Sequence, residues 1–296
     1  MLRGKKLAGG LALLGLGSCS IAFNLDRQQC EVAADCDARG FPASECVQNI
    51  CQPIEETGGS GGEGGAPVVL PAYFECVRHG FTPPVPQDGM ITHKFQFELA
   101  TQAGVVPANL TTKLCSALDV NCLNPDPSAP QPDANGLLTL TLAANFAGFV
   151  EIQSDETMPS LAFFQPPVVL PPTTKLVRLI RQTEFEGLVS AAGRTWDPTR
   201  GSGVVITDDC NDERQAGVYM TSMDLDDQAD IGYFTGALPN LMAEKTDSQG
   251  AGALLNMPVG AVTISTFVFG SGVYIGTNTL RSRAGYISYL PVGPSL

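Results

Sequence analysis

Histidine is scarce in this 296-residue chain, where His79 and His93 are the only two. A Ser-His-Asp hydrolase would need one of these imidazoles beside an activated serine, and no nucleophile elbow joins a strand-like segment to a helix-like one. The H-E-x-x-H sequence of zinc proteases is absent as well. We expect His93, which lies beside Lys94 in a strand-like segment, to be exposed. The sequence therefore predicts no catalytic residue, no cofactor site and no metal site.

Basic residues are also few, because 17 lysines and arginines stand against 30 aspartates and glutamates, for a net charge of −13. A protein that binds nucleic acid neutralises phosphates with basic side chains, so nucleic acid is excluded as a partner. Charged residues make up only 16% of the chain, whereas it has 32 glycines and 22 prolines. This composition disfavours long helices and favours short strands joined by turns. Hydrophobic residues, at 44%, are sufficient for folded cores.

Residues 1–18 predict a lipoprotein signal peptide. Three basic residues precede a mostly apolar run at 7–16, which is too short to span a bilayer. The run ends in Leu16-Gly17-Ser18-Cys19, which resembles a bacterial lipobox. That resemblance implies cleavage before Cys19 and lipidation of its thiol, so that residues 19–29 form a tether. Ser20, rather than Asp, follows the lipidated cysteine, which favours anchoring in the outer membrane of the cell envelope.

A small cysteine-rich module is predicted at residues 30–52. It contains Cys30, Cys36, Cys46 and Cys51. So short a segment cannot bury a useful core, and an exported chain forms disulfides, so we expect two bridges there. Three pairings remain open. The spacing lacks the paired C-x-x-C of zinc sites, and it resembles the cysteine-rich modules of myxobacterial-type surface lipoproteins. A flexible Gly-rich linker is predicted at 53–67.

The remaining chain contains an internal repeat at an offset of about 113 residues. Three motifs recur in order: Gln102-Ala103-Gly104-Val105 with Gln215-Ala216-Gly217-Val218, Asp133-x-x-Gly136 with Asp247-x-x-Gly250, and Gly148-x-Val150-x-Ile152 with Gly260-x-Val262-x-Ile264. We therefore predict two copies of one unit. The first is a β-sandwich at 68–174, and a short helix with the second β-sandwich occupies 175–296.

Both copies have the alternating pattern of strands. Residues 93–99 and 138–142 place apolar side chains at every second position, and a turn at 133–136 precedes the second of these runs. Residues 203–207 and 262–269 read as strands in the second copy. Short strands at this spacing predict an all-β fold of two tandem antiparallel sandwiches, Ig-like or transthyretin-like.

One passage of the second copy resembles the carboxypeptidase regulatory-like family. It consists of Thr246-Asp247-Ser248-Gln249-Gly250, a strand, and Pro258-Val259-Gly260 before a last strand. The resemblance implies transthyretin-like sandwiches of seven strands, which in that family are usually non-catalytic appendages. The first copy departs from the pattern, with Pro132 in place of the threonine and Phe146-Ala147 in place of Pro-Val.

A short helix is predicted between the copies. Thr183 and Glu186 have the spacing of a capping box, and Gly193 is suited to end the helix. Trp196, which follows, is expected in a core or at a turn.

The last four cysteines form an even set. Cys115 and Cys122 bracket six residues and are close enough for a local bridge. Cys76 and Cys210 remain, and their pairing would join the start of the first copy to the second. Both pairs are predicted disulfides.

Two acidic runs, at 208–213 and 224–230, invite a calcium interpretation. They lie at opposite ends of a predicted strand and so about 20 Å apart, too far to share one ion. We expect them to be solvated turns.

Export, an anchor, a spacer and the lack of catalytic motifs predict a non-enzymatic, lipid-anchored envelope protein. Its sandwiches would serve binding, adhesion or envelope architecture, with the membrane as one partner and an envelope protein or a glycan as another. The alternative is a lipid-anchored hydrolase that acts on a glycan or peptide through surface carboxylates brought together only in the fold.

Overall fold

The computed structural model describes residues 44–47, 50–53, 70–78, 89–143, 146–164, 174–211, 213–236 and 238–294. The chain divides into two units, Met1–Gly61 and Gly62–Leu296. In the first unit, strand β1 (Ser44–Val47) pairs antiparallel with β2 (Ile50–Pro53), and Cys46 lies opposite Cys51. The predicted signal peptide, Cys19, Cys30 and Cys36 lie outside the described residues.

The second unit begins with two short helical turns, η1 (Ala72–Phe74) and α2 (Glu75–Arg78). Six strands of the first copy follow: β3 (Met90–Leu99), β4 (Thr111–Ser116), β5 (Leu137–Ala143), β6 (Gly148–Gln153), β7 (Ser160–Phe163) and β8 (Lys175–Leu179). Helix α3 (Gln182–Ala191) leads to the second copy. Its strands are β9 (Gly201–Thr207), β10 (Val218–Thr221), β11 (Asp230–Thr235), β12 (Leu238–Asn240), β13 (Ala251–Met257), β14 (Gly260–Val268), β15 (Tyr274–Ser282) and β16 (Ile287–Val292).

The strand pairing of the first copy recurs in the second. In the first copy β3 pairs antiparallel with β5 and parallel with β8, and β9 pairs in the same way with β13 and β16. The antiparallel pairs β4–β6 and β6–β7 recur as β10–β14 and β14–β15. We call the two copies sandwich 1 and sandwich 2. They confirm the predicted all-β fold of tandem sandwiches. Strand β8 pairs with β3, so it goes with sandwich 1 although the predicted limits assign 175–296 to the second copy.

The repeated Asp-x-x-Gly motif forms the same turn twice. The amide of Gly136 donates to the carbonyl of Asp133 at 2.9 Å, and Gly250 donates to Asp247 at 2.9 Å. Both glycines have a positive φ, at 78° and 57°, a conformation that a side chain disfavours. The recurring sequence motif therefore encodes one turn, which precedes β5 in the first copy and β13 in the second.

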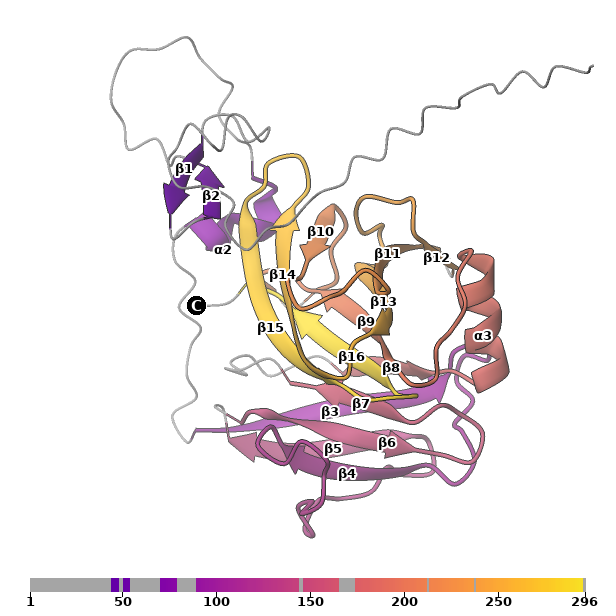
Figure 1. Ribbon diagram of the computed structural model, residues 1–296. Coiled ribbons are helices and arrows are strands. Elements are labelled where there is room, and N and C mark those ends of the chain that lie inside the picture. The colour runs from indigo at the N-terminus through magenta and orange to yellow at the C-terminus, as the bar shows by residue number, and fades with distance from the viewer. Residues whose placement is uncertain are drawn as a thin grey trace, which may run out of the picture. The chain divides into compact units, whose positions relative to one another are not determined.

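One parallel strand pair joins the two sandwiches. Strand β16 lies between β9 and β7 and pairs in parallel with both (Figure 1). Half of sandwich 1 and half of sandwich 2 thereby become one eight-stranded sheet, in the order β12-β11-β13-β9-β16-β7-β6-β4. We call it the central sheet. The sequence did not predict this connection.

The central sheet has a hydrophobic core on each face. Core 1 lies on the side of β5-β3-β8 and α3, and core 2 on the side of β10-β14-β15. Strand β16 supplies both, since Ile287 and Tyr289 enter core 1 whereas Leu290 and Val292 enter core 2. Strands buried on both faces are expected to have continuous apolar sequences rather than alternating ones.

The segment that precedes sandwich 1 is attached to sandwich 2. Leu70 and Phe74 are buried in a small cluster with Val218 of β10. A disulfide joins Cys76 to Cys210, with 6.0 Å between their Cα atoms. The predicted bridge between the start of the first copy and the second copy is therefore present.

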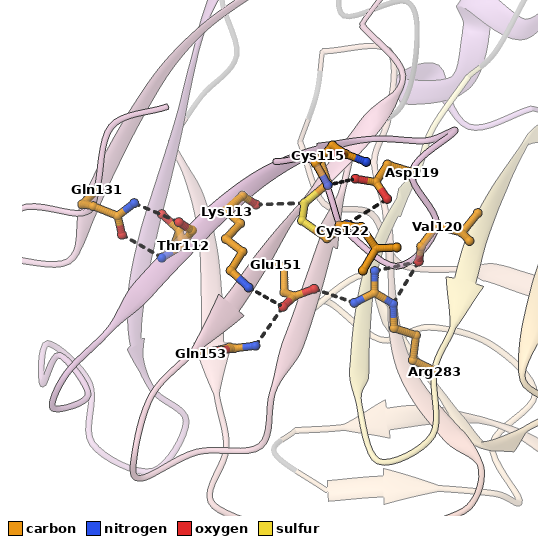
Figure 2. Close-up of a disulfide and its surroundings, with 12 residues drawn as sticks. Thr112, Lys113, Cys115, Asp119, Val120, Cys122, Gln131, Glu151, Gln153 and Arg283 are labelled. Carbon is orange, nitrogen blue, oxygen red and sulfur yellow. Dashed lines mark hydrogen bonds and ion pairs between the residues drawn. A yellow bond between two sulfur atoms is a disulfide. The ribbon is translucent and has the colours of Figure 1, made fainter. Parts of the chain in front are cut away.

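A second disulfide lies where the sandwiches meet (Figure 2). It joins Cys115 to Cys122 as predicted and closes the loop that carries Val120. Arg283, which follows β15 of sandwich 2, donates to the Val120 carbonyl at 2.7 Å and to the Glu151 carboxylate at 2.5 Å. Glu151 lies on β6 of sandwich 1 and is buried. The guanidinium group therefore cross-links the two sandwiches beside the strand pair β7–β16.

Helix α3 begins earlier than predicted. Its N-cap is Arg181, and Glu184 accepts a hydrogen bond from the Arg181 backbone amide at 3.2 Å, so the capping box does not use Thr183 and Glu186. The ion pair between Arg181 and Glu184, at 3.0 Å, favours this earlier start. The predicted end is correct, because Gly193 has a φ of 76° and donates to the Ser190 carbonyl.

Within the described part of the chain, the helices are all too short or too polar to cross a bilayer.

The two disulfides are expected to differ in their contribution to stability. The Cys76–Cys210 bridge closes a separation of 134 residues and the Cys115–Cys122 bridge one of seven. On the chain-entropy model these correspond to about 5 and about 2 kcal/mol. Urea unfolding of C76S/C210S and of C115S/C122S should show the larger loss in the first variant. Equal losses, or a larger one for C115S/C122S, would contradict this ranking.

Candidate functional site

The outer face of the sheet β10-β14-β15 carries a group of aromatic side chains. Alternate residues of β14, from Val262 to Val268, are buried beneath the sheet, so Phe267 lies on the opposite, outer face. In the register, Tyr219 of β10 lies opposite Phe267, and Phe267 lies opposite Tyr274 of β15. Neighbouring strands therefore place three aromatic residues in a row across the sheet.

The rings of this row contact one another. The Tyr219 and Phe267 rings are stacked, with centroids 5.2 Å apart and 19° between their planes. Phe267 and Tyr274 meet edge to face at 5.6 Å. Phe269 meets Tyr219 at 6.5 Å, and the Lys245 ammonium lies 4.8 Å from its ring centroid. We call Tyr219, Phe267, Phe269 and Tyr274 the aromatic platform.

The platform is accessible to solvent. Tyr274 is 43% exposed and Phe269 is 38% exposed, and both count among the large apolar side chains that the fold leaves uncovered. Tyr219 and Phe267 are half-buried. Partial burial raises the pKa of Tyr219, so its phenol stays neutral and able to donate a hydrogen bond at physiological pH.

Hydroxyl groups continue the same outer face next to the platform. Ser265 lies opposite Thr277 in the register and their hydroxyls are 2.5 Å apart. Thr263 lies opposite Thr279, with hydroxyls 3.1 Å apart. The face thus combines flat apolar rings with rows of neutral hydrogen-bonding groups. It suits stacking and hydrogen bonding.

His93, predicted to be exposed, is buried. Its exposed fraction is 7%, and its ring lies 4.9 Å from that of Phe95 and 5.0 Å from that of Phe164. Nδ1 has no hydrogen-bond partner among the described residues. Burial, followed by the positive charge of Lys175, lowers the pKa of His93 to about 4. The imidazole is thus a neutral core side chain.

The first acidic run, at 208–213, is partly buried rather than a solvated turn. Asp208 is 5% exposed and lies 3.1 Å from the Lys175 ammonium. Asp209, equally buried, accepts the amides of Asn211 and Glu213 and so holds its loop.

The second run has exposed aspartates, as expected of a solvated turn. Asp226 and Asp230 also form ion pairs with arginines, at 2.5 Å with Arg200 and 2.7 Å with Arg194. The described residues contain no group of three His, Cys, Asp or Glu side chains arranged to hold a metal ion.

Of the other residues singled out in the sequence, four cysteines are bridged as predicted. The pairing among Cys30, Cys36, Cys46 and Cys51 stays a prediction, as does lipidation of Cys19. Trp196 is half-buried against core 1 and meets the Phe185 ring at 5.9 Å.

Sequence reasoning missed the aromatic platform. The only local signal is Phe267-x-Phe269, which places two aromatic residues on one face of a strand. Tyr219 is 48 positions away from Phe267 in the sequence by their numbers, and only the register of β10 with β14 brings them together.

No protein-family model matches this chain, and no curated protein is found to be similar. Among solved structures, the Bacillus anthracis TIE protein matches with 10% identity and a TM-score of 0.24. The match covers 70% of this chain but only 34% of the length of that protein. A streptococcal ancillary pilin matches with 12% identity and a TM-score of 0.22, over 69% of this chain and 68% of its own. The shaft pilin SpaA of Lactobacillus rhamnosus GG matches with 9% identity and a TM-score of 0.22, over 70% and 98%. TM-scores this low do not establish a shared fold.

Burial of neutral His93 predicts acid sensitivity. The folded-state pKa of about 4 lies below the ordinary 6.5, so below pH 6.5 the unfolded chain binds a proton that the folded chain does not. Stability is therefore lost as the pH falls from 6.5 towards 4, by about 2 kcal/mol between pH 7 and pH 5.

Urea unfolding at pH 7 and pH 5 tests this expectation. His93→Phe should reduce the loss between the two pH values, whereas His79→Gln, which removes the other imidazole, should leave it unchanged. An equal loss in wild type and His93→Phe would show that other groups cause the acid sensitivity.

Proposed function

We propose that this protein is a non-enzymatic, lipid-anchored protein of the cell envelope that binds a neutral glycan on the aromatic platform. The observation that carries the proposal is the in-register row Tyr219, Phe267 and Tyr274. It lies on an outer sheet face, half-buried to exposed, beside two pairs of hydroxyl side chains. Display from an anchor, predicted from the Leu16-Gly17-Ser18-Cys19 sequence, gives such a surface access to glycans of the envelope or of neighbouring cells.

The chemistry of the platform favours a sugar. One face of a pyranose ring is formed by C–H groups and packs on an aromatic ring, whereas its edge carries hydroxyls that need hydrogen bonds. Rings and hydroxyl side chains on one flat face satisfy both requirements. The net charge of −13 disfavours polyanionic glycans, so a neutral polysaccharide is the expected ligand class.

The setting in the envelope rests on the sequence alone. The lipobox-like motif, the cysteine-rich module at 30–52 and the Gly-rich linker support a surface lipoprotein of the myxobacterial type, anchored in the outer membrane. The passage 246–264 supports transthyretin-like sandwiches related to carboxypeptidase regulatory-like domains, which serve as non-catalytic appendages. A lipid-anchored hydrolase remains the alternative, and it would require two carboxylates about 5 to 9 Å apart in a cleft.

Loss of the exposed rings should weaken glycan binding. A glycan array with the purified protein identifies the ligand, and calorimetry then measures its affinity for Tyr274→Ala and Phe269→Ala. We expect each variant to bind about tenfold more weakly, because one stacking contact contributes about 1.4 kcal/mol. Met242→Ala is the matched control, since Met242 is 88% exposed but lies outside the platform. Unchanged affinity in both platform variants, or turnover of the bound glycan, would contradict the proposal.

Replacement of the lipidated thiol should release the protein from the membrane. Cys19→Ser cells are expected to contain the protein with its signal uncleaved and without fatty acids, whereas the wild type should begin at an acylated Cys19. Intact-mass analysis of both proteins measures this difference. A wild-type mass without acyl chains would end the lipoprotein interpretation while leaving the glycan test unaffected.

A further inference from the structure

A cavity of about 200 Å³ lies where helix α3 and strand β8 cover the central sheet. Phe185 and Val189 of α3 line one side, and Ala253 of β13 and Tyr289 of β16 line the other. The cavity is partly open to solvent. It is distinct from the aromatic platform, which lies on the outer face of the sheet β10-β14-β15, beyond core 2.

Small side chains in β13 create this space. Ala251, Ala253 and Leu255 point to the same face of the central sheet and all line the cavity. Both alanines are buried, at 8% and 3% exposure, although a sandwich core normally fills such positions with larger side chains. Because interiors are close-packed, an open apolar volume of this size is a feature that a ligand can use.

The alanines of β13 form the floor of the cavity, and the apolar side chains around them are only partly buried. Leu176 of β8, Val204 and Ile206 of β9, and Phe234 of β11 line the cavity and are half-buried. These side chains come from both sandwiches. An apolar ligand that entered here would remove their remaining surface from water, which favours binding at about 25 cal/mol per Å².

Two arginines stand at the cavity. Arg178 is an ion-pair partner of Glu98, with 3.2 Å between Nε and the carboxylate. Arg214 has no ion pair within 4 Å among the described residues, and its guanidinium donates only to the Leu176 carbonyl, at 3.4 Å. Asp208, the nearby carboxylate, lies 3.1 Å from the Lys175 ammonium. Among the described residues at the cavity, Arg214 is thus a cation without an ion-pair partner, in an otherwise acidic protein.

The guanidinium groups of Arg178 and Arg214 are close enough for their positive charges to interact. Partial burial of the Arg214 guanidinium lowers its pKa; the negative charge of Asp208 raises it, and the positive charge of Arg178 lowers it again. An added anion at this point would be attracted by both groups, and a carboxylate matches the planar, two-pronged geometry of guanidinium.

We propose that the cavity binds a free aliphatic carboxylate, with its tail between α3 and β13 and its carboxylate at Arg214. A dry apolar cavity of about 150 Å³ holds benzene, so the present one holds a tail of about eight carbons. A long-chain lipid is too large. This site is independent of the proposed glycan binding and of the lipid anchor.

Trp196 provides a local reporter, because it is the only tryptophan of the chain and packs against Phe185, which lines the cavity. The full chain with Cys19→Ser, which blocks lipidation, is titrated with 8-bromooctanoate, whose bromine quenches tryptophan fluorescence on contact. The matched neutral compound is 8-bromo-1-octanol. Any contribution of the apolar segment at 7–16 is the same in all variants.

We expect saturable quenching by the carboxylate and about tenfold weaker binding of the alcohol, the difference that one charge-assisted hydrogen bond makes. Arg214→Gln should weaken the carboxylate about tenfold and leave the alcohol unchanged, whereas Arg281→Gln, on β15 away from the cavity, should change neither. Ala253→Leu, which fills the floor, should abolish quenching by both.

Absence of saturable quenching in the parent protein, as would follow if another segment of the chain filled the cavity, would overturn the proposal. Equal affinity for the carboxylate and the alcohol, or no effect of Arg214→Gln, would overturn the role of the arginine. Because Arg214 is exposed, Arg214→Gln is expected to fold even if the buried substitution Ala253→Leu prevents folding. Circular dichroism of each variant checks this.

Discussion

The parallel pairing of β16 with β7 is the contact on which the rest of the molecule depends. It turns two repeats that each have their own sheets into a body with one shared central sheet and a core on either face. Since β16 and β7, which join the two sandwiches, both contribute to both cores, neither sandwich can move without disturbing the packing of the other. The Arg283–Glu151 pair and the Cys76–Cys210 bridge strengthen the same connection. The aromatic platform and the cavity therefore stand on a rigid support, as recognition surfaces require.

The shared sheet also explains where the two candidate binding regions lie. Because elements pack on both faces of the central sheet, the outer faces of the flanking sheets are left for solvent, and the platform occupies one of them. The cavity lies at the junction between the repeats, where β8 and α3 of one repeat cover β9 and β13 of the next. An isolated β-sandwich would have an outer sheet face for the platform, but it would have no junction between repeats to form the cavity.

The sequence predicted the strands that are buried on one face only. The outer strands β3, β5 and β14 alternate buried and accessible positions, and their pattern was recognised. Strand β13 is buried at every position and β7 likewise, so their sequences do not alternate and cannot show to which neighbour they pair. His93 has the same parity as Phe95 and Phe97 and so belonged to the buried face; its polarity misled the prediction. The platform could not be predicted, because it depends on the register between strands that lie far apart in the sequence.

Native-state hydrogen exchange measured against denaturant tests the shared sheet most directly. If β16 unites the two repeats, the slowest amides of β7 and β9, on either side of it, should exchange only through the same global unfolding reaction, with equal free energies and equal dependence on denaturant. Amides of one sandwich that exchange through a separate opening, at lower free energy and with a smaller denaturant dependence, would show that the repeats fold as independent domains and would contradict this account.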